Sequence, residues 1–167
     1  MVTIRLAELA DAEAIRQIYN HYVENTKVTF DLVPRSIEQQ ETWISERAGA
    51  LAVIVAVEQL ADGDETVLGF ASLSPYKDRP AYRTTVEDSV YVAPGHSGKG
   101  VGGLLMRHLV KVASDHGYHA MMARIAEGSA SSVGVHSAVG FQIVGVEKEV
   151  GRKFGQWLDV TVMQKLL

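Results

Sequence analysis

The sequence predicts a single mixed α/β domain, in which a mostly antiparallel central sheet of about seven strands is flanked by about four helices. Short apolar runs alternate with amphipathic helical segments, and a hairpin-type turn separates two of the runs. The chain has 167 residues, of which 47% are hydrophobic, and no internal repeat or low-complexity linker divides it. These observations favour one globular domain spanning residues 1–167.

The N-terminal half contains clear start and turn signals. Residues 2–6 alternate as in a strand, and Asp11 is expected to cap a helix whose apolar residues recur at helical spacing. Ser36 and Gln39 form a capping-box pattern, which predicts the start of a second helix. The turn at 61–64, Ala-Asp-Gly-Asp, lies between two apolar runs, so these runs are expected to pair as antiparallel strands.

The C-terminal half continues the alternation of strands and helices. A glycine-rich turn leads into a helix that carries one apolar stripe and ends near Gly117, and a later helix is closed by Gly140. Two final runs have the pattern of strands. The expected strands are 2–6, 52–57, 66–74, 84–92, 120–125, 142–150 and 157–165, and the expected helices begin at Asp11, Ser36, Val101 and Ser129.

Composition excludes several classes of function. The chain has no cysteine, which excludes a disulfide, a zinc–thiolate site, an iron–sulfur cluster and an acyl-cysteine intermediate. Its formal net charge of −4 gives no broad attraction to nucleic acid or to an anionic membrane. The charged N-terminus has no signal-peptide block and no apolar span of membrane length, and the histidines lack the spacing of metal ligands. We therefore expect a soluble cytoplasmic protein without a metal, nucleic-acid or membrane partner.

The glycine-rich turn at 93–100, Ala-Pro-Gly-His-Ser-Gly-Lys-Gly, is the most informative segment. Glycine lets the backbone approach a ligand closely, and the first N–H groups of a helix, which have no intrahelical partner, attract an anion. The turn therefore predicts a phosphate site. A plain tight turn is the alternative, because glycine clusters are mainly turn signals.

Three common motifs are similar to this turn, and each fails at a specific position. A Walker loop requires glycine where Ala93 stands and serine or threonine where Gly100 stands. A Rossmann turn follows the first strand and is matched by an acidic residue that the run at 120–125 lacks. The nucleophile elbow of α/β-hydrolases requires glycine where Lys99 stands. Both nucleotide motifs and the hydrolase nucleophile are therefore disfavoured.

Longer motifs resemble one family. The segments VYVAPGHSGKGVGGLLM at 90–106 and HSAVGF at 136–141 are similar to the acetyl-coenzyme A signature of the GNAT N-acetyltransferases. The order of the expected elements agrees with this family over essentially the whole chain. Four further segments resemble the phosphinothricin and methionine sulfoximine acetyltransferase branch: IYNHYVENT at 18–26, TFD at 29–31, TVEDSVYV at 85–92 and FGQWLDV at 154–160.

For the cofactor, acetyl-CoA, the resemblance implies a strand that splays from its neighbour, with the pantetheine arm lying in the gap like an added strand. The pyrophosphate is expected on backbone N–H groups at the helix start, with help from the charge of Lys99. The implied cofactor-binding residues are Val90, Tyr91, Val92, Gly98, Lys99, Gly100, Val101, Gly102, Gly103, Ser129 and His136.

Two positions depart from the pattern of the family. Ser97 stands where arginine or glutamine is usual, and the loss of a longer donor is expected to loosen cofactor binding. Ser129 stands where related sequences often have asparagine, and it is expected to cap the following helix and to offer its hydroxyl to the cofactor. Neither change affects the backbone cradle.

Two residues are candidates for the chemistry. Glu87 precedes the expected cofactor strand and shares a strand face with Ser89 and Tyr91, so it is our candidate general base for an amine. The alternative for Glu87 is a solvated carboxylate. His136 stands where many GNAT enzymes have a tyrosine near the coenzyme A sulfur, which implies cofactor contact and leaves proton donation open. The alternative for His136 is a helix histidine that a neighbouring carbonyl satisfies.

The acyl acceptor is expected beside a basic loop that precedes the candidate base. Arginine suits a carboxylate because its planar fork donates two parallel hydrogen bonds, and Arg79 resembles the substrate loop of the branch. A solvated basic loop is the alternative. The expected substrate-binding residues are Lys77, Asp78, Arg79, Tyr82, Glu87, Asp88, Ser89 and Phe30.

These residues together predict an acetyl-CoA-dependent N-acetyltransferase. It is expected to acetylate the α-amino group of a small amino acid or analogue, of the methionine sulfoximine, phosphinothricin or methionine sulfone type, by direct attack in a ternary complex. The alternatives are a noncatalytic acyl-CoA-binding sensor and a GNAT enzyme acting on a different amine. By resemblance, the protein is also expected to be a homodimer with its C-terminal strands near the interface.

Overall fold

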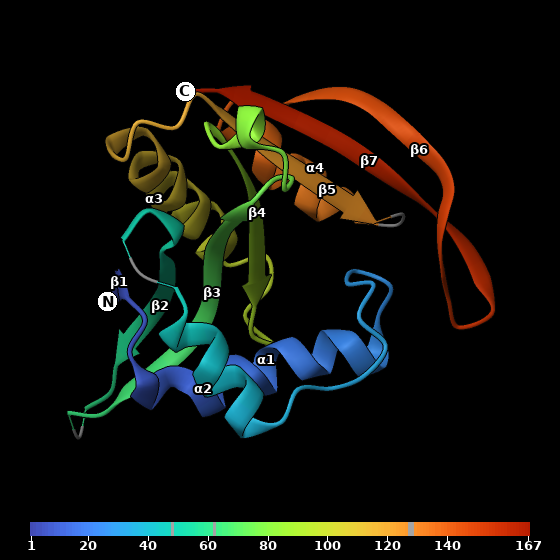
Figure 1. The fold of residues 1–167 in the computed structure, drawn as a ribbon. Coiled ribbons are helices and arrows are strands. Elements are labelled where there is room, and N and C mark those ends of the chain that lie inside the picture. The colour runs from blue at the N-terminus through green and yellow to red at the C-terminus, as the bar shows by residue number, and fades with distance from the viewer. Residues whose placement is uncertain (48, 62, 127–128) are drawn as a thin grey trace.

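The computed structural model describes residues 1–47, 49–61, 63–126 and 129–167. Strands and helices follow one another in the expected order (Figure 1). The strands are β1 (Val2–Leu6), β2 (Val53–Gln59), β3 (Glu65–Pro75), β4 (Thr85–Val92), β5 (Ala120–Ala126), β6 (Gln142–Lys153) and β7 (Gln156–Leu166). The helices are α1 (Ala12–Asn25), α2 (Ile37–Ser45), α3 (Val101–Asp115) and α4 (Ala130–Ala138), with short 3-10 turns η1 (Leu9–Asp11), η2 (Gly49–Leu51) and η3 (Pro80–Tyr82).

The strands form one seven-stranded sheet in the order β1-β2-β3-β4-β5-β7-β6. Each neighbouring pair is antiparallel except β4 and β5, which run parallel. The predicted fold class, a mixed and mostly antiparallel sheet with flanking helices, is confirmed. The hairpin turn predicted at 61–64 includes Asp62, which lies outside the described residues, but β2 and β3 pair antiparallel as expected.

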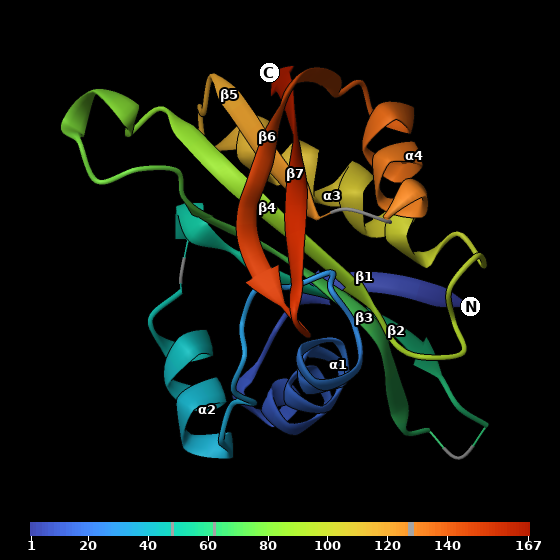
Figure 2. The ribbon, with the colours of Figure 1, turned by 90° about the vertical axis from the view of Figure 1, so that its right-hand side faces the viewer.

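Helices cover both faces of the sheet. Helices α1 and α2 lie on one face, and α3 and α4 lie on the other (Figure 2). Because successive side chains of a strand point to opposite faces, Val55 of β2 packs with the first pair of helices and Ile54 packs with α3. The same alternation along β4 directs Val90 to the α3 side and Tyr91 to the α1 side. The strand β4 therefore contributes to both cores.

The starts of the first two helices differ in how well the sequence predicted them. The capping box of α2 is confirmed, because Ser36 Oγ accepts from the Gln39 N–H at 3.2 Å and Gln39 Oε1 accepts from the Ser36 N–H at 2.9 Å. Asp11 occupies the N-cap position of α1 as predicted, but its side chain makes no capping bond to that helix. Its backbone is already helical, since η1 leads directly into α1, and its carboxylate instead accepts from the Glu8 N–H at 2.8 Å and pairs with Arg5 at 2.7 Å.

The hairpin formed by β6 and β7 is longer than the expected strands at 142–150 and 157–165, since β6 ends at Lys153 and β7 begins at Gln156. Figure 1 shows this hairpin arching past the rest of the sheet, toward the loop that follows α1. We call its end, residues 150–157, the hairpin tip. The tip therefore lies near a loop from the opposite end of the chain.

Candidate active site

A gap opens between β4 and β5 because their pairing stops early. It covers only Thr85–Glu87 and Ala120–Met122, whereas the strands continue to Val92 and Ala126. Beyond Glu87, the backbone edge of β4 faces this gap instead of a neighbouring strand. Unpaired backbone groups suit an extended ligand that adds to the sheet. The splayed strand that the resemblance implied is thus confirmed.

The gap widens into a groove of about 350 Å³ between the glycine turn and α4. Eight of the predicted cofactor-binding residues line this groove: Val90, Tyr91, Val92, Gly98, Gly100, Gly102, Gly103 and Ser129. Three others lie elsewhere. Lys99 is exposed and the side chain of Val101 is buried in the core, so Val101 offers only its backbone, while His136 lines a neighbouring small cavity. Contact between these residues and the cofactor stays a prediction.

The glycine turn shapes one end of the groove. Gly98 and Gly100 have φ of +77° and +84°, a left-handed conformation that glycine adopts without steric cost. The first backbone bond into α3 runs from the Leu104 N–H to the Gly100 carbonyl at 3.0 Å, so the N–H groups before Leu104 have no intrahelical acceptor. This end of the groove therefore fits an anionic group such as a phosphate.

Ser97, which the sequence analysis related to cofactor binding, also lines the groove, whereas six further lining residues were missed: Tyr22, Val28, His96, Ser131, Ser132 and Val135. The phenol of Tyr22 donates to the Val92 carbonyl at 2.7 Å across 70 positions of sequence, so no local pattern marked it. Unlike Tyr22, Ser131 and Ser132 could have been predicted as lining residues, because they form a run of hydroxyls at the start of a predicted helix. Ser129 occupies the N-cap of α4 without a side-chain capping bond, so its predicted capping role is wrong.

Glu87 lies at the point where β4 and β5 separate, since it is the last β4 residue that pairs with β5. The side chain is half-buried on the α1 face of the sheet, opposite Ser74 of β3. Burial raises the pKa of Glu87, and the nearby Arg124 guanidinium opposes this increase. A carboxylate with a raised pKa at this position is suited to accept a proton from an amine.

Asp88 and His136 form a buried pair on the opposite face of β4. His136 Nε2 lies 2.8 Å from Asp88 Oδ2, and His136 Nδ1 lies 2.7 Å from the Ser132 carbonyl. Both side chains are almost fully buried, with 3% and 2% exposure for His136 and Asp88. Strand alternation turns the Asp88 carboxylate away from Glu87 and against His136, and contact of Asp88 with the substrate stays a prediction. Neither ring nitrogen of His136 is free.

The predicted acceptor loop is exposed. Lys77, Asp78, Arg79 and Tyr82 surround one surface hollow with Tyr76. The Lys77 ammonium lies 4.9 Å from the Tyr76 ring centroid and 5.3 Å from that of Tyr82. Lys77 also interacts electrostatically with Glu147, and Arg124 forms an ion pair with Glu147 beside Glu87. Electrostatic interactions therefore connect Lys77 of the loop to Glu87 by way of Glu147 and Arg124. The role of the loop in substrate binding stays a prediction.

Phe30 lies in a different place, on the loop between α1 and α2. Its ring covers Gly151 at the hairpin tip so closely that a Cβ there would lie 2.2 Å from the ring. The buried Lys153 ammonium donates to the Thr29 carbonyl at 2.9 Å, and Lys27 donates to Gln156 Oε1 at 2.9 Å. These three contacts fix the loop to the tip. The fixed loop places Val28 over the groove.

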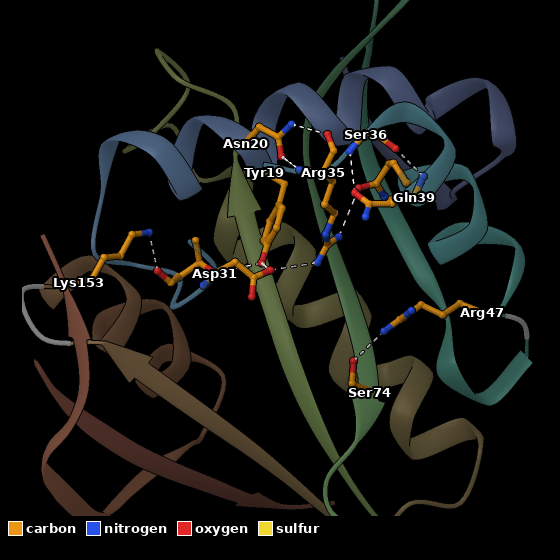
Figure 3. Close-up of polar contacts among 11 residues, drawn as sticks. Tyr19, Asn20, Asp31, Arg35, Ser36, Gln39, Arg47, Ser74 and Lys153 are labelled. Carbon is orange, nitrogen blue, oxygen red and sulfur yellow. Dashed lines mark hydrogen bonds and ion pairs between the residues drawn. The ribbon is translucent and has the colours of Figure 1, made fainter. Parts of the chain in front are cut away.

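The same loop is held to α1 by polar contacts (Figure 3). Tyr19 donates to Asp31 Oδ2 at 2.5 Å, and its oxygen lies 3.0 Å from Thr29 Oγ1. The Arg35 guanidinium lies over the Tyr19 ring, 3.9 Å from its centroid. Tyr19 in turn meets Tyr91 of β4 edge to face, with centroids 5.2 Å apart. The loop is therefore connected to the strand that borders the groove.

Comparison with known proteins gives consistent matches. The acetyltransferase (GNAT) domain matches residues 4–162. A phosphinothricin N-acetyltransferase of Streptomyces coelicolor is 38% identical over 99% of this chain and 96% of its own length. An L-methionine sulfoximine/L-methionine sulfone acetyltransferase of Pseudomonas paraeruginosa is 39% identical over 97% of this chain and 92% of its own.

Solved structures agree with these relatives. An acetyltransferase from Salmonella typhimurium, determined with its cofactor acetyl-CoA, superposes with a TM-score of 0.93 at 38% identity, covering 100% of this chain and 94% of that one. A GNAT phosphinothricin acetyltransferase from Sinorhizobium meliloti in complex with acetyl-CoA gives 0.92 at 36% identity, covering 99% and 88%.

Proposed function

Because this chain belongs to the GNAT acetyltransferase family, we propose that it acetylates the α-amino group of a small amino acid or amino-acid analogue. It is an acetyl-CoA-dependent N-acetyltransferase, so the predicted family, reaction class and cofactor are confirmed. The main observation that supports catalysis at this gap is the position of Glu87, whose half-buried carboxylate lies at the point where β4 and β5 separate. The noncatalytic sensor does not explain that placement.

The residues of the groove fit the expected cofactor. The N–H groups at the start of α3 are suited to hold the pyrophosphate, and the free edge of Val90–Val92 is suited to bind the pantetheine amides. Acetyl-CoA supplies an activated acetyl thioester. In the proposed reaction Glu87 accepts the proton that the attacking amine loses, directly or through a water molecule. Backbone N–H groups of β4 stabilise the negative charge that develops on the carbonyl oxygen.

For the acceptor we propose the class that the named relatives share: methionine sulfoximine, methionine sulfone or phosphinothricin. These molecules carry an α-ammonium, a carboxylate and a polar tetrahedral group, so they need both a base and cationic partners. Glu87 provides the base for the α-ammonium group, and Lys77 and Arg79 on the exposed loop provide the cationic partners for the anionic groups. Phe30 and Ser89 complete the proposed acceptor site. A different primary amine is the second candidate for the acceptor.

The experiment measures thiol release from acetyl-CoA with a panel of acceptors. We expect turnover with methionine sulfoximine, methionine sulfone or phosphinothricin, and none with the corresponding α-N-methyl or α-keto compounds. Turnover with polyamines alone would replace the acceptor class but keep the reaction. If calorimetry shows coenzyme A binding while no amine in the panel releases thiol, the protein is a binding module and the proposal is wrong.

We also propose that the protein acts as a homodimer in the cytoplasm, where acetyl-CoA is available. Exposed apolar side chains on β6 support an interface there, namely Ile143, Val144, Val146 and Val150, with Trp157 on β7. No helix in the described part of the chain is long and apolar enough to cross a membrane. Sedimentation velocity at micromolar concentration tests the dimer, and a monomer at all concentrations contradicts it.

A further inference from the structure

The buried pair of Asp88 and His136 has a defined hydrogen-bond arrangement. The Ser132 carbonyl only accepts hydrogen bonds, so the facing Nδ1 of His136 carries a proton. When the Asp88 carboxylate is ionised it only accepts, so Nε2, which faces Asp88, then carries a proton as well. A histidine with both ring nitrogens protonated is an imidazolium cation. The two short contacts are thus those that an imidazolium makes when it is paired with a carboxylate.

This ion pair borders the place where acetyl transfer is proposed. Asp88 and His136 line a cavity of about 50 Å³ together with Ser89 and Val90 of β4 and Ala123 of β5, within the gap between the strands. Asp88 Oδ1 is buried and has no hydrogen-bond partner among the described residues. The imidazole ring is also held from the side by Phe141, edge to face, with centroids 5.1 Å apart.

We propose that Asp88 is a positioning residue that keeps His136 in the doubly protonated form, so that the imidazolium of His136 stabilises negative charge on the departing sulfur. This inference rests on the proposed acetyl transfer. In that reaction the amine nitrogen bonds to the acetyl carbon, the carbon–sulfur bond breaks, and sulfur keeps the electron pair. The amine proton goes to Glu87. Because both His136 protons are held by Asp88 and Ser132, His136 acts as a fixed cation instead of the direct proton donor.

The charges around the pair are consistent with this role. Burial, the largest single influence, lowers the pKa of His136. The hydrogen bonds and charge of Asp88 and the Ser132 carbonyl together outweigh it, so the pKa of His136 lies above its usual value. The charge of Asp88, on the other face of the sheet, raises the pKa of Glu87. Arg124 and Glu147 are the other described charges that affect the pKa of Glu87. An imidazolium at this depth without its carboxylate would be an unpaired buried charge, which proteins avoid by losing the proton. Asp88 therefore decides the charge of His136.

The protonation of His136 is measured directly by long-range ¹H–¹⁵N NMR of the ¹⁵N-labelled full chain. We expect both ring nitrogens of wild-type His136 to show protonated shifts between about pH 6 and pH 8. One unprotonated nitrogen in wild-type protein at neutral pH overturns the proposal. This measurement needs no acceptor, so it remains informative even if the proposed function fails in the thiol-release assay.

Asp88→Asn tests the link to catalysis, because asparagine keeps the shape of the side chain and removes its charge. We expect neutral His136 in this variant at neutral pH, and a decrease in kcat of about tenfold or more with an unchanged KM for the acceptor. The matched control is Asp115→Asn, an exposed aspartate on α3 that pairs with Lys111 at 2.6 Å, which should leave kcat unchanged. A wild-type kcat and pH profile in Asp88→Asn overturns the proposal.

A double-mutant cycle separates positioning from an independent effect. If Asp88 acts through His136, the variant Asp88→Asn/His136→Gln is no slower than His136→Gln alone. Multiplicative losses overturn the proposal, because Asp88 would then act by another route. Asp88→Ser replaces Asp88→Asn if the latter does not fold, with the same expectation for the charge of His136.

Discussion

The two halves of the candidate site are built in different ways. The cofactor half is local: residues 93–100 form a turn with three left-handed glycines, and helix α3 begins directly after it. The acceptor half is assembled from distant segments, because the Lys153–Thr29 and Lys27–Gln156 contacts span 124 and 129 positions. Backbone conformation determines the first half, and side-chain contacts over long range determine the second. Changes in the two halves should therefore affect different kinetic constants.

The electrostatic character also differs between the halves. Hydroxyls, glycines and apolar side chains dominate the cofactor groove, whereas Glu87, Arg124, Glu147 and Lys77 bring alternating charges to the acceptor side. A groove of this kind binds through backbone N–H groups and shape. A charged surface of this kind selects substrates by their ionic groups. Salt should therefore weaken acceptor binding more than pantetheine binding.

The largest expected effect is that of Glu87→Gln, at the junction of the two halves. We expect kcat to decrease by about 10²–10⁴-fold, since the variant lacks the base, while the affinity for coenzyme A stays unchanged. In the wild type the base acts ionised, so activity falls as the pH decreases through the pKa of Glu87, which burial raises above the usual 4.5. The Gln variant should lose this acidic limb, as measured by pH–rate profiles.

Glu24→Gln, an exposed change on α1, is the matched control for loss of a carboxylate. Full activity in this control and wild-type kinetics in Glu87→Gln would together remove Glu87 as the base. Loss of coenzyme A affinity in Glu87→Gln would show that the two halves are not separable at this residue.

The next effect is that of Gly100→Ala, which addresses the cofactor half alone. No atom lies within 4 Å of the added Cβ, so the cost comes from the left-handed backbone and is about 1–2 kcal/mol. We expect a similar loss in the free energy of unfolding, measured in urea, and about tenfold weaker coenzyme A binding, with an unchanged acceptor KM.

Gly134→Ala in α4 is the opposite control, because that position is also open but has no left-handed backbone. It should raise stability by roughly 0.5–1 kcal/mol, as alanine does within a helix. If Gly100→Ala and Gly134→Ala change the free energy of unfolding by the same amount, the left-handed conformation at Gly100 does not contribute to the effect.

A smaller effect is expected from Gly151→Ala, which addresses the acceptor half. The new methyl group would overlap Phe30, so the ring must move and the loop must loosen. We expect the acceptor KM to increase about fivefold, consistent with a displaced positioning group, and faster hydrogen exchange at 27–31. Gly145→Ala on the same strand, where nothing lies within 4 Å, is the matched control, and equal effects of both changes contradict the role of Phe30.

The smallest effect is that of Ser97→Arg, which restores the longer donor usual in the family. We expect coenzyme A to bind about threefold more tightly at low salt, through a charge-assisted contact with phosphate, and the gain to disappear at high salt. Titration calorimetry at two salt concentrations measures both. A gain that persists at high salt would point to packing instead of charge.

The sequence predicted most of the architecture because its signals are local. Helix α3 follows a glycine turn and carries one apolar stripe, and the capping box of α2 consists of residues three positions apart. The pair of Asp88 and His136 was missed because 48 positions separate its members. Strand alternation puts Asp88 on the face opposite Glu87, although both were predicted to bind the substrate. Its partner, however, depended on how α4 packs against the sheet.

The interruption of pairing between β4 and β5 leaves a free strand edge within the sheet. Such an edge lacks the hydrogen bonds that a neighbouring strand supplies, and it invites pairing with other chains. A ligand that occupies this edge completes the sheet, so its binding energy adds to folding energy: at a concentration of 100 Kd it contributes about 2.7 kcal/mol. The unfolded fraction of the protein therefore depends on the supply of coenzyme A thioesters in the cell. Because proteases degrade the unfolded form, the rate of degradation depends on this supply as well.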